Sequence, residues 1–132
     1  MHVIFNLIMV THSEHLKNIL RHILDSYQFL SEIEDKPGDL AKIEKEMLKI
    51  NGFIKVVSNK IDSDKIPTSD FKIVKVKFSQ YLQNYSFEKE IKTMTSLYFN
   101  DMSRVKNIRL KILEALKNKN MIDDVKELVE NI

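Results

Sequence analysis

Three histidines near the start of the chain are the first candidates for chemistry. His12, His15 and His22 lie close to Glu14, and imidazole and carboxylate groups can bind a metal ion or exchange protons near neutral pH. In the helical register set by the neighbouring apolar residues, however, His15 and His22 both face outward and lie two turns apart, about 10 Å along the axis. That separation is too long for one shared ion, and no second ligand pair with zinc spacing follows. We therefore expect solvent-facing helix residues here and predict no metal site.

Other signatures of catalysis or cofactor binding are missing from the sequence. It contains no cysteine, no Gly-rich phosphate loop, no Gly-x-Ser-x-Gly and no His-Glu-x-x-His. Asp62-x-Asp64 lacks the further ligands and the central glycine of a calcium loop. Asp123 and Asp124 are typical of the acidic first turn of a helix. The sequence thus predicts no catalytic residue, no cofactor and no enzymatic activity.

The segment 102–119 carries a concentration of positive charge and is the candidate contact with nucleic acid. It has six basic residues and one acidic residue, Glu114, which leaves a local excess of five charges (6 − 1 = 5). Such a helix could neutralise phosphates, and the candidate contacts are Arg104, Lys111 and Lys117. The basic residues do not form one stripe, and no aromatic residues alternate with them in the manner of RNA-binding surfaces. A solvated charged face is the preferred interpretation.

Arg109 differs from the other basic residues of this segment. It lies within the apolar arc of the helix, flanked by Val105, Ile112 and Leu113. A guanidinium group in apolar surroundings must either pair with an anion or extend outward to water. We therefore expect Arg109 to have a specific partner or to reach the surface.

The run Glu14-His-Leu-Lys-Asn-Ile-Leu20 resembles the phosphoacceptor motif of sensor histidine kinases, in which a His is followed by an acid, Leu, Lys or Arg, Asn or Thr, and a later Leu. In that family the motif lies on the first helix of a dimerising hairpin, and the resemblance covers at most residues 11–62. Aligning the Leu-Lys-Asn triplet places Glu14 where the family has its phosphorylated His, and His15 where it has the acid. The resemblance therefore implies a degenerate dimerisation or phosphotransfer hairpin.

Length and composition indicate a single folded domain spanning residues 1–132. The chain is 43% hydrophobic and 30% charged with a formal net charge of +2, which is an ordinary balance for a folded protein. Only two Gly and two Pro occur, so long helices are favoured. The lack of cysteine fits a reducing compartment, and we expect a cytoplasmic protein.

The first ten residues are apolar but too few to span a bilayer. We therefore expect a buried or interface element there, either a short strand or the first turns of a helix, and no membrane association.

The strongest structural signal is a stripe of seven apolar residues at alternating steps of three and four. This spacing is typical of a helix that buries one seam against other helices. The stripe stays in phase across Asn51-Gly52, which favours one continuous helix over a break followed by a strand at 53–57. We refer to the following seven residues as the α-helical stripe: Leu40, Ile43, Met47, Ile50, Ile54, Val57 and Ile61.

A second amphipathic helix precedes the stripe. Thr11-His-Ser-Glu14 matches a capping box, and the apolar spacing after it continues to Ile33, before Pro37-Gly38 interrupts it. Asp39 can cap the helix that follows. Two long helices joined by a short link form an antiparallel hairpin, which we place at residues 12–62.

The second half of the chain is less regular. Residues 71–78 fit either a helix or a half-buried strand, with the helix preferred, and a strand there could pair with residues 3–10. Ser86 is expected to cap a helix that ends at Tyr98, Asn100 or Asp101 to cap a helix over 102–117, and Asp123 or Asp124 to begin the last helix.

The sequence as a whole predicts an all-α bundle of five to six helices, built on the hairpin 12–62 with a smaller helical half at 70–132 and room for a minor two-stranded β element. The favoured function is a non-enzymatic helical module for protein–protein interaction or regulation. We expect a homodimer that uses the α-helical stripe or the N-terminal segment, together with another protein as partner. The alternatives are a nucleic-acid-associated accessory subunit and the histidine-kinase-like hairpin.

Overall fold

The computed structural model describes the backbone of residues 2–36, 38–62, 69–85 and 87–131, and the side chains of residues 14–36, 38–59, 72–85 and 87–130. Throughout this described part the fold is all-α. Its elements in chain order are α1 (His2–Glu32), α2 (Asp39–Asp62), α3 (Ser69–Asn84), α4 (Glu88–Leu97), α5 (Met102–Lys117), the 3₁₀ turn η1 (Asn118–Asn120) and α6 (Met121–Asn131).

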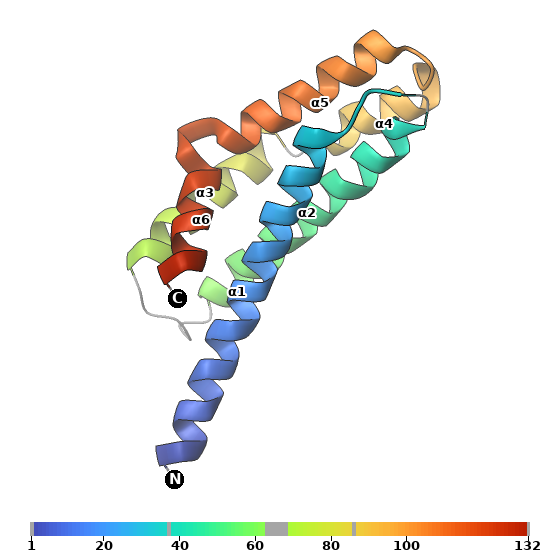
Figure 1. The fold of residues 1–132 in the computed structure, drawn as a ribbon. Helices are drawn as coiled ribbons and strands as arrows, with labels where there is room; N and C mark the ends of the chain where they lie inside the picture. The colour runs from blue at the N-terminus through green and yellow to red at the C-terminus, as the bar shows by residue number, and fades with distance from the viewer. Residues whose placement is uncertain (1, 37, 63–68, 86, 132) are drawn as a thin grey trace.

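The helices α1 and α2 run antiparallel and form the long axis of the molecule (Figure 1). Gly38 lies in the link between them with φ of 93°, a conformation that favours glycine. Asp39 begins α2, and its carboxylate reaches back to accept a hydrogen bond of 2.9 Å from the backbone N–H of Lys36. α1 and α2 pack on each other, and α2 passes through Asn51 and Gly52 without a break.

The start of the first helix differs from the capping-box expectation and decides between the two alternatives for the N-terminal segment in favour of a helix. The helix does not start at the capping box Thr11–Glu14, because α1 already begins at His2. No Pro or Gly occurs before Pro37, so nothing interrupts helical hydrogen bonding between the apolar start and the amphipathic segment. The same helix excludes the proposed strand at residues 3–10.

Residues 71–78 belong to α3, and the described part of the chain contains no β-strand. The strand interpretation depended on Val74, Val76 and Phe78 sharing one face. In the helix Val74 and Phe78 are buried, four residues apart, whereas Val76 is 56% exposed. Helical packing of Val74 and Phe78 against the core thus prevails over the local alternation of apolar and Lys residues.

The ends of the later helices follow the sequence signals in part. Asp101 is the N-cap of α5, and its carboxylate accepts a 3.1 Å hydrogen bond from the backbone N–H of Arg104, as predicted. Ser86, the predicted cap of α4, lies outside the described residues, and the N-cap position is held by Phe87 at φ 60° without a side-chain hydrogen bond. The last helix begins at Met121, so Asp123 lies within its first turn rather than before it.

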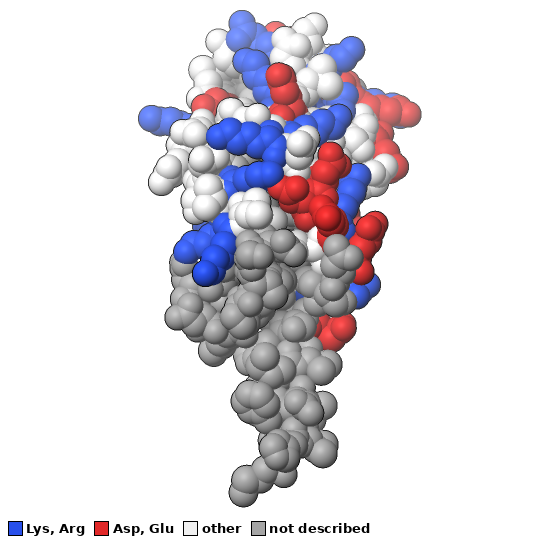
Figure 2. Space-filling view, turned by 90° about the vertical axis from the view of Figure 1, so that its left-hand side faces the viewer, with Lys and Arg blue, Asp and Glu red and all other residues white. Residues whose placement is uncertain are grey.

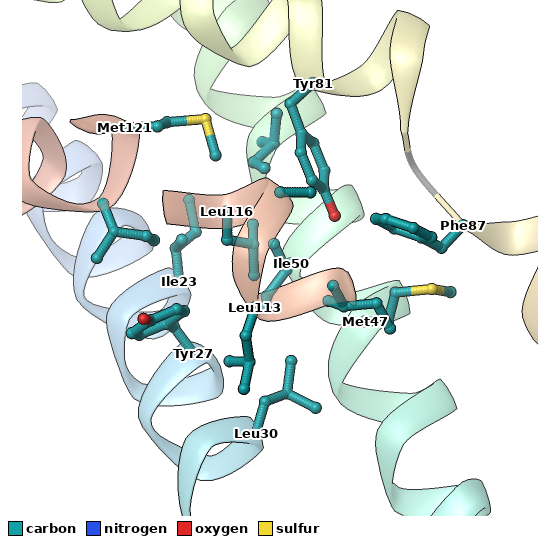
Figure 3. Packing of buried hydrophobic residues seen from close by; sticks show 14 of the residues in the cluster. Ile23, Tyr27, Leu30, Met47, Ile50, Tyr81, Phe87, Leu113, Leu116 and Met121 are labelled. Atoms are coloured by element: carbon teal, nitrogen blue, oxygen red, sulfur yellow. The ribbon is translucent and has the colours of Figure 1, made fainter. Parts of the chain in front are cut away.

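One hydrophobic core connects all the helices. α1 packs on α2, α5 and α6, and α2 packs also on α3 and α4. Figure 3 shows how side chains from different helices converge there, among them Ile23 of α1, Met47 of α2, Tyr81 of α3 and Leu116 of α5. Among the described residues, no helix combines the length and the apolar character needed to cross a membrane.

Candidate functional site

The α-helical stripe is used inside a single copy of the chain. Its six residues with described side chains are at most 4% exposed, whereas the side chain of Ile61 lies outside the described residues. Burial of this kind gives the seam its stabilising effect, about 1.5–3 kcal/mol for each large apolar side chain. A homodimer would therefore have to form through a surface other than these six residues: Leu40, Ile43, Met47, Ile50, Ile54 and Val57.

Two members of the histidine cluster, His15 and His22, have described side chains. His15 and His22 are both exposed on α1, and the His22 ring stacks on Phe53 of α2 with centroids 5.3 Å apart and an interplanar angle of 16°. His12 lies outside the described side chains. Among the side chains that the structure describes, no group of three His, Cys, Asp or Glu could hold a metal ion. Glu14 and His15 of the kinase-like motif are exposed, and Leu16 and Leu20 lie in the core.

Arg109 meets the anion that its apolar surroundings require. Its Nε donates to Asp35 Oδ1 at 2.8 Å and its Nη2 to Asp35 Oδ2 at 3.0 Å, and its Nη1 donates to the backbone carbonyl of Leu30 at 3.1 Å. The hydrogen bonds that Arg109 donates to Asp35 raise the pKa of Arg109 against the opposing effect of its burial. This bidentate pair fastens the middle of α5 to the link between α1 and α2, and it removes Arg109 from the charged surface.

Arg104 is also engaged within the chain. Its Nε lies 3.2 Å from Asp101 Oδ2, and its guanidinium carbon lies 4.0 Å from the centre of the Tyr98 ring. A guanidinium group over an aromatic face is attracted by the negative face of the ring. Of the predicted nucleic-acid contacts, Arg104 therefore already has an acidic and an aromatic partner.

Lys111 and Lys117 are the other two predicted contacts, and the structure brings them to one cavity. Both are exposed, and their ammonium groups make no hydrogen bond or ion pair with a described residue. The cavity has a volume of about 660 Å³ and lies between the C-terminal end of α5 and the connection from α3 to α4. We call it the lysine cavity, and its lining consists of Tyr85, Phe87, Lys111, Glu114, Ala115, Lys117, Asn118 and Lys119.

A second hollow lies between α4 and α5 and shares Lys111 with the lysine cavity. Its volume is about 350 Å³. We call it the α4–α5 groove; Met94, Tyr98 and Ile108 form its apolar part, and its polar lining consists of Glu90, Thr93, Arg104, Asn107 and Lys111. At the end of α4, next in sequence to Tyr98, Leu97 and Phe99 are 68% and 59% exposed. Large apolar side chains that stay exposed on a surface are typical of a binding site for another protein.

Sequence reasoning found the lysines of this region but missed the aromatic residues around them. The segment 102–119 has no aromatic residue of its own, whereas Tyr85, Phe87 and Tyr98 reach it from the connection before α4 and from the end of α4. One local signal was available, because Tyr98-Phe99 directly precedes the turn residues Asn100-Asp101. Two adjacent aromatic residues at a helix end cannot both be buried by that helix.

Comparison of the chain with known protein families, with curated proteins and with solved structures found no match.

Proposed function

We propose that this protein is a non-enzymatic interaction module that holds an amphipathic helix of a partner protein in the α4–α5 groove. The observation that carries the proposal is the exposure of Leu97 and Phe99, the sequence neighbours of Tyr98, which itself lines the groove. The scaffold for this role is the bundle of five to six helices predicted from the sequence. A partner that covered Leu97 and Phe99 would remove their apolar surface from water, which favours association.

The chemistry of the groove fits a helix whose apolar face is flanked by acidic residues. Met94 and Ile108 line the groove but are only 8% and 7% exposed, so most of the apolar contact area would come from Leu97 and Phe99. On the rim, the ammonium group of Lys111 has no ion-pair partner among the described residues. An acidic side chain on the partner would supply one and would also set the orientation of the bound helix.

The proposal is tested by partner capture from an extract of the native host. Wild-type protein is compared with the Leu97→Glu/Phe99→Glu variant, which places charge on the proposed surface. The matched control is Ile73→Glu/Val76→Glu on α3, because these two residues are 53% and 56% exposed and charge there should disturb folding to a similar small degree.

We expect a partner that is retained by the wild type and by the α3 control and is lost from the Leu97/Phe99 variant. A synthetic peptide that covers the partner's helix should then compete for the same surface. Retention by all three proteins, equal loss from both variants, or no specific partner for the wild type would each contradict the proposal.

Self-association is tested separately by light scattering at high micromolar concentration. A dimer that is lost in the Leu97→Glu/Phe99→Glu variant would assign the groove to a second copy of the chain. A dimer that is kept in this variant would leave the groove to another protein. A monomer would end the homodimer prediction without affecting the groove proposal.

Each of the two alternative functions predicted from the sequence now depends on one or two residues. Nucleic-acid binding now depends on Lys111 and Lys117, since Arg104 and Arg109 both have acidic partners within the chain. A gel shift that survives charge reversal at these two lysines would end this alternative.

The histidine-kinase-like alternative depends on the exposed His15. No phosphate uptake from a phosphorylated response regulator, and no effect of His15→Ala, would end it.

A further inference from the structure

Three lysine side chains share the lysine cavity, and two of them have no partner there. Lys119 Nζ donates to Gln80 Oε1 at 2.9 Å, whereas Lys111 and Lys117 make no hydrogen bond or ion pair with a described residue. Glu114 is the one carboxylate among the lining residues. Lys117 lies in the last turn of α5, where the helix dipole already favours a cation. Lys111 lies too far from the C-terminal end of α5 for the helix dipole to stabilise its unpaired charge.

In Figure 2, Lys and Arg side chains lie over the left and centre of the face that carries α3 and α6, whereas Asp and Glu side chains lie mainly to the right, with both signs mixed near the top. At the cavity itself three lysines outnumber the one carboxylate. Charges of one sign that gather around a hollow raise the local concentration of oppositely charged ligands. The cavity is therefore suited to an anion.

An aromatic surface adjoins the lysines. The rings of Tyr85 and Phe87 are stacked with centroids 6.0 Å apart and an interplanar angle of 20°, and Tyr85 is 38% exposed. Asn118 fixes Tyr85 by donating a 3.0 Å hydrogen bond from its side-chain amide to the phenolic oxygen. An exposed ring held in this way offers a flat face on which a nucleobase can stack.

The backbone around the cavity is held in conformations that L-residues seldom adopt. Phe87, Lys119 and Asn120 have φ of 60°, 55° and 60°, and they are the non-glycine residues with positive φ in the described part of the chain. Phe87 and Lys119 both line the cavity, and Asn120 directly follows Lys119 in the chain. Lys77 holds this turn, since its Nζ donates to the backbone carbonyl of Lys119 at 2.6 Å and pairs with Asp124. Strained residues of this kind persist where the surrounding structure fixes them, and they cluster at ligand sites.

From these observations we propose that the lysine cavity binds a nucleoside phosphate. Lys111 and Lys117 would hold the phosphate groups, the base would stack on Tyr85, and the Glu114 carboxylate would accept a hydrogen bond from a ribose hydroxyl or a base amino group. A volume of about 660 Å³ lies within the range of small-ligand sites. The ligand is a compact anion rather than a polymer, because the unpaired lysines converge on one hollow while Arg104 and Arg109 are paired elsewhere. This site shares Lys111 with the α4–α5 groove, but neither Leu97 nor Phe99 lines it.

The test is isothermal titration calorimetry of the full chain with ATP, AMP, adenosine and inorganic triphosphate. ATP should bind at least tenfold more tightly than adenosine, and the Lys111→Gln/Lys117→Gln variant should lose at least tenfold in ATP affinity. The matched control is Lys106→Gln/Lys126→Gln, two exposed lysines that do not line the cavity, and its affinity should equal that of the wild type.

A second variant separates base recognition from charge. Tyr85→Leu removes the aromatic face but keeps an apolar side chain, so it should weaken ATP binding and leave triphosphate binding unchanged. Absence of ATP binding at millimolar concentration, equal loss in the lysine variant and its control, or binding that appears only with a single-stranded oligonucleotide would each overturn the proposal.

Discussion

The ion pair between Arg109 and Asp35 provides the sharpest test of how this fold is held together. Its two side chains are 10% and 15% exposed, and they are joined by parallel hydrogen bonds of 2.8 and 3.0 Å. Removing one partner of a fully buried pair costs about 3–5 kcal/mol, because the other charge is left without compensation. Since both side chains here retain some contact with water, we expect about 2–3 kcal/mol for Arg109→Met and for Asp35→Asn.

The double variant is the informative one. Arg109→Met/Asp35→Asn removes both charges, so it should cost clearly less than the sum of the two single changes, with a coupling free energy of about 2 kcal/mol. Urea denaturation followed by far-ultraviolet circular dichroism measures the free energy of unfolding of all four proteins. Arg104→Met on the same helix is the control, because the pair of Arg104 with Asp101 is 54% and 43% exposed and should contribute less than about 1 kcal/mol. Costs that simply add in the double variant would refute this reasoning.

Three further changes have definite expected outcomes in the same denaturation assay. Gly52→Ala should raise the free energy of unfolding by about 1 kcal/mol, because Gly52 is exposed inside α2 and a Cβ there meets no atom within 4 Å; a loss would show that α2 is not continuous there. Tyr81→Phe should stabilise the protein by about 1 kcal/mol at neutral pH, since the buried hydroxyl has no hydrogen-bond partner among the described residues. Burial also raises the pKa of Tyr81 above its ordinary value of 10.0, so the phenol loses its proton at lower pH in the unfolded chain than in the folded one. For each pH unit above 10, the free energy of unfolding of the wild type should therefore fall by about 1.4 kcal/mol more than that of the variant. Parallel pH profiles of the two proteins would contradict this. The Lys119→Gly variant should be more stable than the Lys119→Ala variant by about 1 kcal/mol, because φ is 55° at this position. If the alanine variant were the more stable of the two, as it is at an ordinary helical position, the turn would not be left-handed.

Periodicity over long segments is what made the hairpin predictable. Three heptads of the α-helical stripe carry more information than a single unfavourable residue, so the exposed Gly52 did not break the prediction. The rule that a guanidinium group in an apolar arc must pair with an anion or extend to water likewise gave a specific partner as one of two expected outcomes for Arg109. Its identity was beyond the sequence, because Asp35 is 74 residues away and lies in a link without periodicity.

The features that could not be predicted depend on local signals that the rest of the fold overrides, or on contacts between distant segments. Thr11–Glu14 has the residues of a capping box, but a cap forms only where a helix begins, and the apolar segment before it is itself helical. The lysine cavity joins Tyr85 and Phe87 to Lys111 and Lys117, which are some 25–30 residues further along the chain. No spacing within either segment indicates this juxtaposition, and the left-handed turn at Lys119 that shapes it contains no glycine.

Hydrogen–deuterium exchange of the protein alone and in complex with its captured partner tests the central claim, that the α4–α5 groove is the binding surface. The expected result is slower exchange in α4, in the turn with Leu97 and Phe99, and in the first half of α5, with unchanged exchange in α3. Slower exchange confined to α3 or to the outer face of α1 and α2, with no change at Leu97 and Phe99, would contradict the claim.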